Sequence, residues 1–199
     1  MNEYTAPLRD MQFVLNELGH LDELSRLPDC DALSPDLADA ILNEAGKFAQ
    51  GVLSPLNVSG DREGARWLDG EVTTAKGWRE AYQQFVEGGW NALSCKPEFG
   101  GQDLPFLVST LVDEMWYGAN MAFGLCPMLT RGAIEAIELC GSDALKETYL
   151  PKMISGEWTG TMNLTEPQAG SDLAAIRSRA EPQADGTYRI HGQKIFITY

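Results

Sequence analysis

The sequence predicts a mainly α-helical protein, with an antiparallel helical bundle followed by the beginning of a β domain of barrel-like or sandwich type. Two observations support this fold class. Apolar residues recur at helical spacing through most of residues 34–157, and the connections between helical stretches are short. After Trp158 the pattern changes to alternation, with glycine-containing turns. We therefore expect a helical extension at residues 1–33, a helical bundle at residues 34–157 and an incomplete β domain at residues 158–199.

Composition limits the classes of function. Of the 199 residues, 44% are hydrophobic, which is enough for a packed core. The formal net charge of -14, from 29 acidic and 15 basic residues, argues against nucleic acid or an anionic membrane surface as a partner. No stretch approaches the ~20 apolar residues of a spanning helix, and the first residues lack the features of a signal or transit peptide. These features predict a cytoplasmic protein without a membrane span.

The cysteines do not indicate a metal site. The four cysteines form no Cys-x-x-Cys pair, and the only histidines, His20 and His191, lie far from them in the sequence. Zinc sites gather cysteine and histidine ligands at short spacings. We therefore expect no metal, and four reduced or buried thiols in an intracellular protein.

The N-terminal extension is expected to be helical. Its apolar residues recur at helical spacing, and Gly19 offers a stop after them. Two roles remain open for it: it covers exposed core of the bundle, or it contacts a substrate directly. The residues that carry the pattern are Leu8, Met11, Val14, Leu15 and Leu18.

The first helices of the bundle can be placed from capping and turn residues. Ser34 as N-cap and Pro35 at the first helical position begin a helix, whose far end is expected at Pro55. Residues 57–75 are polar and rich in glycine, so a loop is expected there. A second helix is expected over residues 76–88.

The strongest helical pattern covers residues 104–115 and predicts a central, buried helix. Residues 120–127 are expected to form a bend. A helix over residues 130–140 should follow and end at Gly141, and Ser142 should cap the next helix.

Beyond the bundle, residues 159–164 and 194–198 are expected to form strands. Residues 184–186 should form the turn of a hairpin, with a second turn at residues 191–192. A sheet that stops at the last of these strands has an unpaired edge and little core of its own. From this we expect the 199 residues to be the N-terminal part of a longer polypeptide, or a chain cut at this point.

The loop at residues 165–172 is the most informative stretch. It begins with the hydroxyl of Thr165, and Gly170 lets a backbone approach a ligand closely. Ser171 or Asp172 can cap the turn that follows and leave free N–H groups that suit a phosphate. A strand, this loop and a second strand form a plausible flavin cradle. The triplet Gly-Ser-Asp at residues 170–172 also occurs in ordinary turns, however.

The motifs of the chain resemble the signature of the acyl-CoA dehydrogenase flavoprotein family. Residues 164–172 (Leu-Thr-Glu-Pro-x-Ala-Gly-Ser-Asp) and residues 192–198 carry the resemblance. Residues 96–101 are similar to the family's Pro-Glu-aromatic-Gly-Gly loop, and residues 149–158 to the segment before its first strand. The extension at residues 1–33 is similar to that of a subgroup with larger subunits, which includes enzymes acting on 3-methylmercaptopropionyl-CoA and on some medium- or long-chain acyl-CoAs.

The resemblance implies an FAD-dependent dehydrogenation of an acyl-CoA thioester. A carboxylate base takes the α-proton, the β-hydrogen leaves as hydride to flavin N5, and a trans-2-enoyl thioester results. In the family the base is a glutamate of a C-terminal helical domain, which would lie beyond Tyr199, and Glu166 resembles a structural position. We therefore expect the 199 residues alone to be inactive and to bind FAD weakly.

Contacts to the flavin ring follow from the same resemblance. Thr165 would hydrogen-bond the pyrimidine side of the flavin, and Met162 and Leu164 would flank the ring. Taken singly, Thr165 is more often an ordinary strand residue, and the other two are more often core residues. The joint pattern favours the flavin site.

The remaining contacts lie on the loop and the last strand. The backbone of Gly170 and the hydroxyl of Ser171 would lie by the FAD pyrophosphate, and Ser171 also by the CoA substrate. Phe196 stands where many members have tryptophan and would pack on the ring. Thr198, preceded by Ile197, would lie near N5, where the hydride arrives.

The partners implied by the resemblance are an acyl-CoA and electron-transfer flavoprotein, with a homo-oligomer (dimer or tetramer) as the assembled state. An acyl-CoA oxidase or flavin monooxygenase of the same fold remains an alternative. A non-catalytic helical scaffold that has kept the fold is another. Residues 123–128 either line the acyl pocket or serve plain packing.

Overall fold

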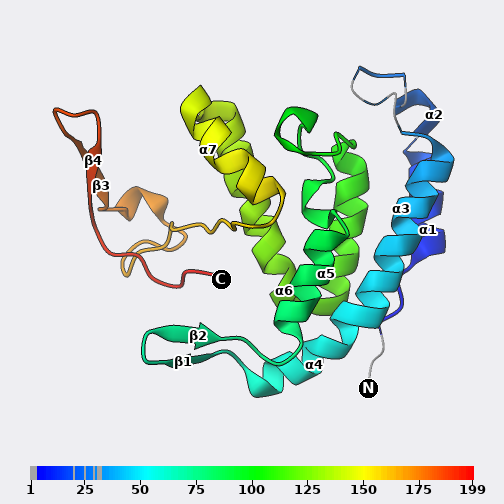
Figure 1. Ribbon diagram of the computed structural model, residues 1–199, viewed down its shortest axis with the longest axis horizontal. Helices are drawn as coiled ribbons and strands as arrows, with labels where there is room; N and C mark the ends of the chain where they lie inside the picture. Colours follow the sequence, from blue (N-terminus) through cyan, green and yellow to red (C-terminus); the bar gives the residue numbers. More distant parts are fainter. Residues whose placement is uncertain (1–3, 20, 25, 29, 31–32) are drawn as a thin grey trace.

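The computed structural model describes residues 4–19, 21–24, 26–28, 30 and 33–199 (Figure 1). The chain begins with α1 (Leu8–Phe13), which continues as a π-helical turn (Val14–Leu18), and then forms α2 (Leu21–Leu24). This confirms the predicted helical character of the extension within the described residues.

The extension covers the core of the bundle. Its Ala6 N–H donates to Gln50 Oε1 at 2.7 Å. The Tyr4 ring packs on Gly118, where an added Cβ would lie only 2.7 Å from the ring. Met11 and Leu15 are buried in the same core as α3 (Pro35–Phe48).

A single long helical stretch follows the extension. The Ser34 hydroxyl accepts a hydrogen bond from Leu37 N–H at 3.2 Å, which confirms the predicted N-cap of α3. A π-helical turn (Ala49–Leu53) then leads directly into α4 (Ser54–Glu63). The prediction that the helix ends at Pro55 is therefore wrong. Proline lacks the backbone N–H, but the first turn of a helix does not use that group, so Pro55 can occupy the first turn of α4.

The predicted loop at residues 57–75 is also wrong, because α4 is followed by a β-hairpin. Strand β1 (Arg66–Leu68) pairs antiparallel with β2 (Glu71–Thr73). The turn residues Asp69 and Gly70 have φ values of 52° and 89°, as a type I′ turn requires. The hairpin projects from the bundle at the lower left of Figure 1.

The next helices match the predicted pattern more closely. Helix α5 (Trp78–Glu87) begins two residues later than expected, and the central helix is α6 (Phe106–Cys140). At Asn120, with φ -159° and ψ 88°, α6 reverses direction. The predicted bend at residues 120–127 is thus confined to a single residue, and Pro127 lies inside the second half of α6.

Contacts between the two halves of α6 show the reversal. Arg131, on the second half, forms an ion pair with Asp113 on the first, although 18 positions separate them. The Arg131 guanidinium also lies 5.7 Å from the ring centroid of Phe106. A straight helix would place these residues more than 25 Å apart, at ~1.5 Å per residue. The two halves therefore lie antiparallel.

The buried side chain of Asn120 holds the reversal. Its Oδ1 accepts the Phe123 N–H at 3.1 Å, which caps the second half of α6. Its Nδ2 donates to the Leu53 carbonyl at 3.2 Å and so attaches the reversal to the end of the π-helical turn. A single amide thus positions α6 against the stretch formed by α3 and α4.

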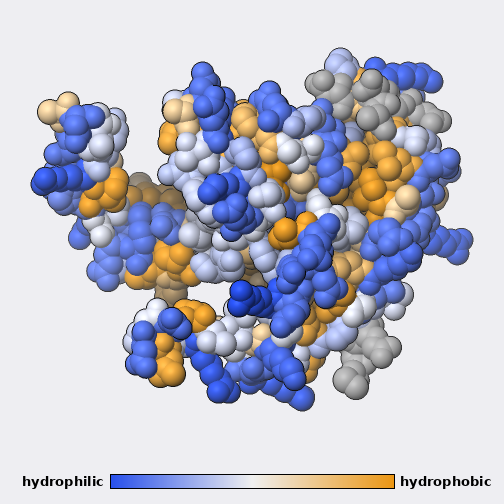
Figure 2. All heavy atoms as spheres, in the orientation of Figure 1, coloured by the Kyte–Doolittle hydropathy of each residue, from blue (hydrophilic) through white to orange (hydrophobic). Residues whose placement is uncertain are grey.

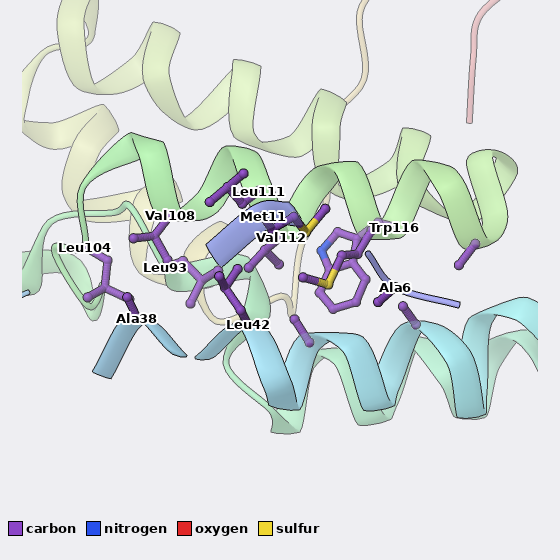
Figure 3. Packing of buried hydrophobic residues seen from close by; sticks show 14 of the residues in the cluster. Ala6, Met11, Ala38, Leu42, Leu93, Leu104, Val108, Leu111, Val112 and Trp116 are labelled. Atoms are coloured by element: carbon purple, nitrogen blue, oxygen red, sulfur yellow. The ribbon is translucent and has the colours of Figure 1, made fainter. Parts of the chain in front are cut away.

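Aromatic residues fill the core between these elements. Buried Trp116 contacts Phe48 and Trp90 edge-on, each with ring centroids 5.4 Å apart, and Phe85 at 6.1 Å. Figure 3 shows Trp116 and its neighbours pointing into one interior between α3 and α6. A smaller cluster forms where the second half of α6 meets α7 (Asp143–Ile154), which Ser142 caps as predicted.

The C-terminal segment contains one hairpin. Strand β3 (Arg179–Pro182) pairs antiparallel with β4 (Tyr188–His191), which confirms the predicted turn. Residues 159–164 and 194–198 do not form the predicted strands, and the described residues contain no closed barrel. A single backbone hydrogen bond, from Ile195 N–H to the Thr165 carbonyl at 2.9 Å, joins these segments. A strand needs a continuous ladder, which one bond does not provide.

The carboxylate of Glu166 holds the C-terminal segment together. It is buried and accepts hydrogen bonds from Lys194 Nζ at 2.8 Å and from the N–H groups of Arg177 and Ser178 at 2.8 and 3.0 Å. The Lys194 ammonium foremost, and these N–H groups, hold the pKa of Glu166 well below its usual range. The side chain thus has the structural role that the sequence predicts.

Replacing Asn120 with alanine is expected to lower the free energy of unfolding by about 1–3 kcal/mol, because the helix cap is lost and the Leu53 carbonyl loses a donor. Urea denaturation measures this change. Asn120→Ser keeps a capping oxygen but loses the amide N–H that donates to the Leu53 carbonyl, and its stability should fall between those of wild type and the alanine variant. Equal stability of all three proteins would contradict the proposed role of the amide.

Replacing Glu166 with glutamine is expected to lower the midpoint of thermal unfolding at pH 7. Because the folded-state pKa is depressed, the stabilisation is fully present above the ordinary carboxyl pKa of 4.5 and is lost as the pH falls below it. The difference between wild type and Glu166→Gln should therefore shrink in acid. The exposed Glu157, in an ion pair with Lys152, provides the control as Glu157→Gln, with little change expected.

Candidate functional site

The structure brings together the two segments that the sequence assigns to a flavin cradle. The Thr161 hydroxyl donates to the Thr198 carbonyl at 2.6 Å, and Lys194 Nζ donates to the Leu164 carbonyl at 2.9 Å. With the bond from Ile195 to Thr165, these contacts place residues from both segments side by side.

The apolar side chains of these segments are open to solvent. The exposed fraction is 85% for Phe196 and 59% for Met162, and Leu164 and Ile197 are also exposed. Core residues would be buried. In the described residues Met162 and Leu164 are exposed and therefore do not belong to the core. A flat, partly apolar ligand placed on these segments would cover these side chains.

The loop between the segments places Gly170 next to Thr165. Glu166 and Ala169 form an antiparallel bridge, with 3.0 Å hydrogen bonds in both directions, so their outer neighbours Thr165 and Gly170 lie opposite each other. A Cβ added to Gly170 would meet nothing within 4 Å. The exposed Ser171 follows. The loop therefore presents open backbone next to Thr165.

The N–H groups of this loop can receive an anion. Within the described residues, those of Gly170, Ser171 and Asp172 have no hydrogen-bond acceptor. The Asp172 side chain caps Ala174 N–H at 3.1 Å, as predicted. The turn that follows is only a short 3-10 helix (Leu173–Ala175), so its dipole is small. Attraction of a phosphate would come from the N–H groups themselves.

A cleft of about 760 Å³ lies between α4, the β1–β2 hairpin, α5 and the second half of α6. Tyr199 also lines it, and the Tyr199 hydroxyl accepts a hydrogen bond from Thr159 at 3.3 Å. The cleft is therefore continuous with the segments of the cradle. Its wall is mainly apolar and includes Val58, Gly60, Val72, Trp78, Tyr82, Phe123, Cys126 and Tyr199.

The inner wall of the cleft carries no charge at neutral pH. Burial raises the pKa of the Tyr82 hydroxyl and of the Cys126 thiol, so both stay protonated. The Tyr82 hydroxyl donates to the Gly156 carbonyl at 3.0 Å, which fixes its ring. Asp61 and Arg79, both exposed, are the charged residues of the lining.

Sequence reasoning found part of this cleft. The residues 123–128 that were candidates for an acyl pocket contribute Phe123 and Cys126 to its wall. The contribution of the hairpin was missed, although Asp69-Gly70 between short β-prone runs is a strong hairpin signal. The described residues of the extension do not line the cleft but pack on the core of the bundle. Of the two roles left open for the extension, the structure therefore favours covering the core over contact with a substrate.

Other kinds of site have no support in the described part of the chain. It contains no cluster of three side chains that could hold a metal ion. The cysteines are all free thiols. No described helix combines the length and apolar character needed to span a membrane.

Comparison with known proteins identifies close likenesses. The chain matches the family described as acyl-CoA dehydrogenase, N-terminal domain, over residues 36–157. It is 48% identical over 196 residues to the 3-methylmercaptopropionyl-CoA dehydrogenase of Ruegeria pomeroyi, covering 98% of this chain and 33% of that protein. Butyryl-CoA dehydrogenase from Megasphaera elsdenii has a similar structure, with a TM-score of 0.70 and 25% identity over 83% of this chain and 41% of that one.

A further solved structure shares the fold. It is an acyl-CoA dehydrogenase from Bacillus anthracis in complex with FAD, with a TM-score of 0.68 and 23% identity over 89% of this chain and 28% of that one. The present chain spans about a third of the length of the curated relative that it matches. The family match covers more than half of the 199 residues, and the chain therefore belongs to the acyl-CoA dehydrogenase family.

Proposed function

We propose that the chain is the N-terminal part of an FAD-dependent acyl-CoA dehydrogenase, which converts an acyl-CoA thioester into the trans-2-enoyl-CoA. The observation that carries this proposal is the joining of residues 159–165 to residues 194–199, which leaves apolar side chains exposed beside a loop of free N–H groups. The division into an extension at residues 1–33, a bundle at residues 34–157 and an incomplete β domain at residues 158–199 is part of the same proposal.

The residues of the cradle fit FAD. Met162, Leu164 and Phe196 offer exposed apolar surface to the isoalloxazine ring, and the Thr165 hydroxyl would hydrogen-bond its pyrimidine side. When bound, the flavin supplies an acceptor for a hydride. Thr198, next to Ile197 and tied to Thr161, would lie near the ring atom that receives it.

The loop would hold the phosphates of the cofactor. Open backbone at Gly170 allows a pyrophosphate to approach, and the Ser171 N–H and hydroxyl can donate hydrogen bonds to it. Ser171 would also contact the CoA part of the substrate. The net charge of -14 does not oppose this site, because N–H groups act at short range.

Glu166 is not the catalytic base in this proposal. Its carboxylate is buried and bonded to Lys194 and to two N–H groups, and its pKa is lowered. A general base works best with a pKa near the operating pH and with access to the substrate proton. As the family resemblance implies, the base is proposed to be a glutamate beyond Tyr199, and the 199 residues alone should not turn over a substrate.

The assembled enzyme is proposed to be a cytoplasmic homo-oligomer, a dimer or a tetramer, that acts on an acyl-CoA and passes electrons to electron-transfer flavoprotein. Family membership supports this assignment. The acidic composition supports the absence of nucleic acid as a partner.

The full-length protein is expected to be yellow, with FAD bound, and to lose its flavin absorbance when an acyl-CoA is added without oxygen. Stopped-flow absorbance measures this bleaching, and the 199-residue chain provides the comparison that should not bleach. Rapid peroxide release on admission of air would indicate an oxidase instead. A full-length protein that neither carries nor takes up FAD would leave the non-catalytic scaffold as the explanation.

Replacing Gly170 with valine is expected to weaken FAD binding at least about tenfold, or about 1.4 kcal/mol, because the side chain fills the space for the cofactor. Titration of the apoprotein with FAD, followed by fluorescence, gives the dissociation constant. Gly132 on α6 also has open space around its Cβ position and lies outside the cradle, so Gly132→Val is the matched control. Equal weakening by both substitutions would count against the loop as the phosphate site.

A further inference from the structure

We infer that Thr130 is a positioning residue for the proposed dehydrogenation. Its hydroxyl attaches the segment that would carry the flavin ring to the helical bundle, and so sets where the ring lies. The inference rests on the proposed function and adds to it a residue of the bundle that acts through the cradle.

The Thr130 hydroxyl lies in the second half of α6, and the residue is only 1% exposed. It donates to the Cys126 carbonyl, one turn earlier, at 2.9 Å and accepts the Gly160 N–H at 3.1 Å. A hydroxyl has one proton to donate, and here that proton is committed to its own helix. The oxygen is therefore an acceptor with a fixed direction at a defined place on α6.

The absence of a side chain at Gly160 lets the segment lie directly on the bundle. An added Cβ would be 2.6 Å from the Cβ of Ala133 on α6 and 3.1 Å from the end of the Met153 side chain on α7. Such a close approach leaves the backbone little room to slide. The hydrogen bond to α6 then fixes its place along the helix.

Two other side chains hold the chain between α7 and the cradle. Asn91 Nδ2 donates to the Met153 carbonyl at 2.6 Å. The Tyr82 hydroxyl, on α5, donates to the Gly156 carbonyl at 3.0 Å. The bond from Gly160 is the third attachment of this kind and the nearest to the cradle.

Beyond this attachment the backbone bonds to the other half of the cradle. Among the described residues, no other backbone group of residues 159–199 forms a hydrogen bond with the bundle. Met162 follows Gly160 by two positions and Leu164 by four. Figure 2 shows the far end of the C-terminal segment, at upper left, standing clear of the bundle. The place of the ring-facing side chains relative to the bundle therefore depends on the bond to Thr130.

Transfer of a hydride is sensitive to such placement. A misplacement of ~1 Å can slow a reaction about 100-fold, because the reacting atoms must be close and aligned. The loop that would hold the phosphates of FAD is ordered separately, by the buried carboxylate of Glu166. Loss of the Thr130 hydroxyl should therefore slow the reaction while leaving the affinity for FAD almost unchanged.

The first test removes the hydroxyl in the full-length, FAD-loaded protein. Flavin bleaching is followed by stopped-flow absorbance without oxygen, with saturating butyryl-CoA, octanoyl-CoA or 3-methylmercaptopropionyl-CoA. Thr130→Val should bleach at least about tenfold more slowly, with a dissociation constant for FAD within about threefold of wild type. Thr130→Ser keeps the hydroxyl and should restore the rate. Thr110→Val is the matched control, because the exposed Thr110 hydroxyl, also on α6, donates only to the Phe106 carbonyl four residues earlier, at 2.8 Å.

A second variant displaces the segment from the other side of the contact. Carbon atoms in contact lie about 3.5–4.0 Å apart, so the methyl group of Gly160→Ala must move away from Ala133 by about 1 Å. This variant should also bleach slowly, even if Thr130→Val does not fold. Gly132→Ala, with open space at its Cβ position on α6, should behave as wild type.

Hydrogen exchange gives a readout that needs no turnover. Peptides that contain Gly160 should exchange faster in Thr130→Val than in wild type, whereas peptides from the first half of α6 should not, since only the attachment of the segment is lost. Faster exchange throughout α6 would show a role in helix stability alone and would overturn the inference.

Three kinetic results would also overturn it: a wild-type bleaching rate in both Thr130→Val and Gly160→Ala, equal slowing by Thr130→Ser and Thr130→Val, or a loss of FAD affinity with no change in the rate of the loaded protein. Each of these results leaves the proposed dehydrogenase standing. That proposal fails, and the inference with it, if no acyl-CoA bleaches the flavin of the wild-type protein.

Discussion

The reversal of α6 at Asn120 is the constraint on which the rest of the structure depends. No loop separates the two halves, so one buried amide must cap the second half and bind the Leu53 carbonyl at the same time. The ion pair between Asp113 and Arg131 holds the halves together farther out. Because the second half returns at this point, Phe123 and Cys126 face α4 and α5, and a cleft exists between them.

The candidate cofactor site depends on a different kind of interaction. The segments on either side of it lack the ladder of a sheet, and a buried carboxylate takes the place of that ladder. Glu166 binds donors from two separated stretches of chain, residues 177–178 and Lys194, so the loop with Gly170 is held while its outward N–H groups remain free. The same hydrogen bonds that order the loop lower the pKa of Glu166 and remove it from the acid–base chemistry of the site.

Features set by neighbouring residues were predictable from the sequence, and features set by distant ones were not. The caps at Ser34 and Ser142 and the hairpin turn near Gly186 depend on a few adjacent residues, and all were predicted correctly. Residues 159–164 and 194–198 fail as strands because a strand also needs a partner, which local pattern does not provide.

At α4 the sequence predicts a loop where the structure has a helix, whereas at residues 159–164 and 194–198 it predicts strands that do not form. The polar, glycine-containing composition of α4 favours a loop, but Gly60 is needed there for close contact with Trp78, and tertiary packing overrides propensity. The members of the cradle were identified from a motif. The cleft could be found only in part, because its walls come from four elements that meet only in the folded chain.

The π-helical turn at Ala49–Leu53 has a consequence for how the chain tolerates change in length. A π-turn holds one more residue than an α-turn, so α3 and α4 are joined with an angular offset that an unbroken α-helix would not have. Deleting one residue here would rotate all of α4 by about 100° relative to α3. Gly60 would then turn away from Trp78, and the start of the hairpin would swing with it. Point substitutions on the exposed face of α4 should be harmless, whereas a single-residue deletion in this turn would change the shape of the cleft.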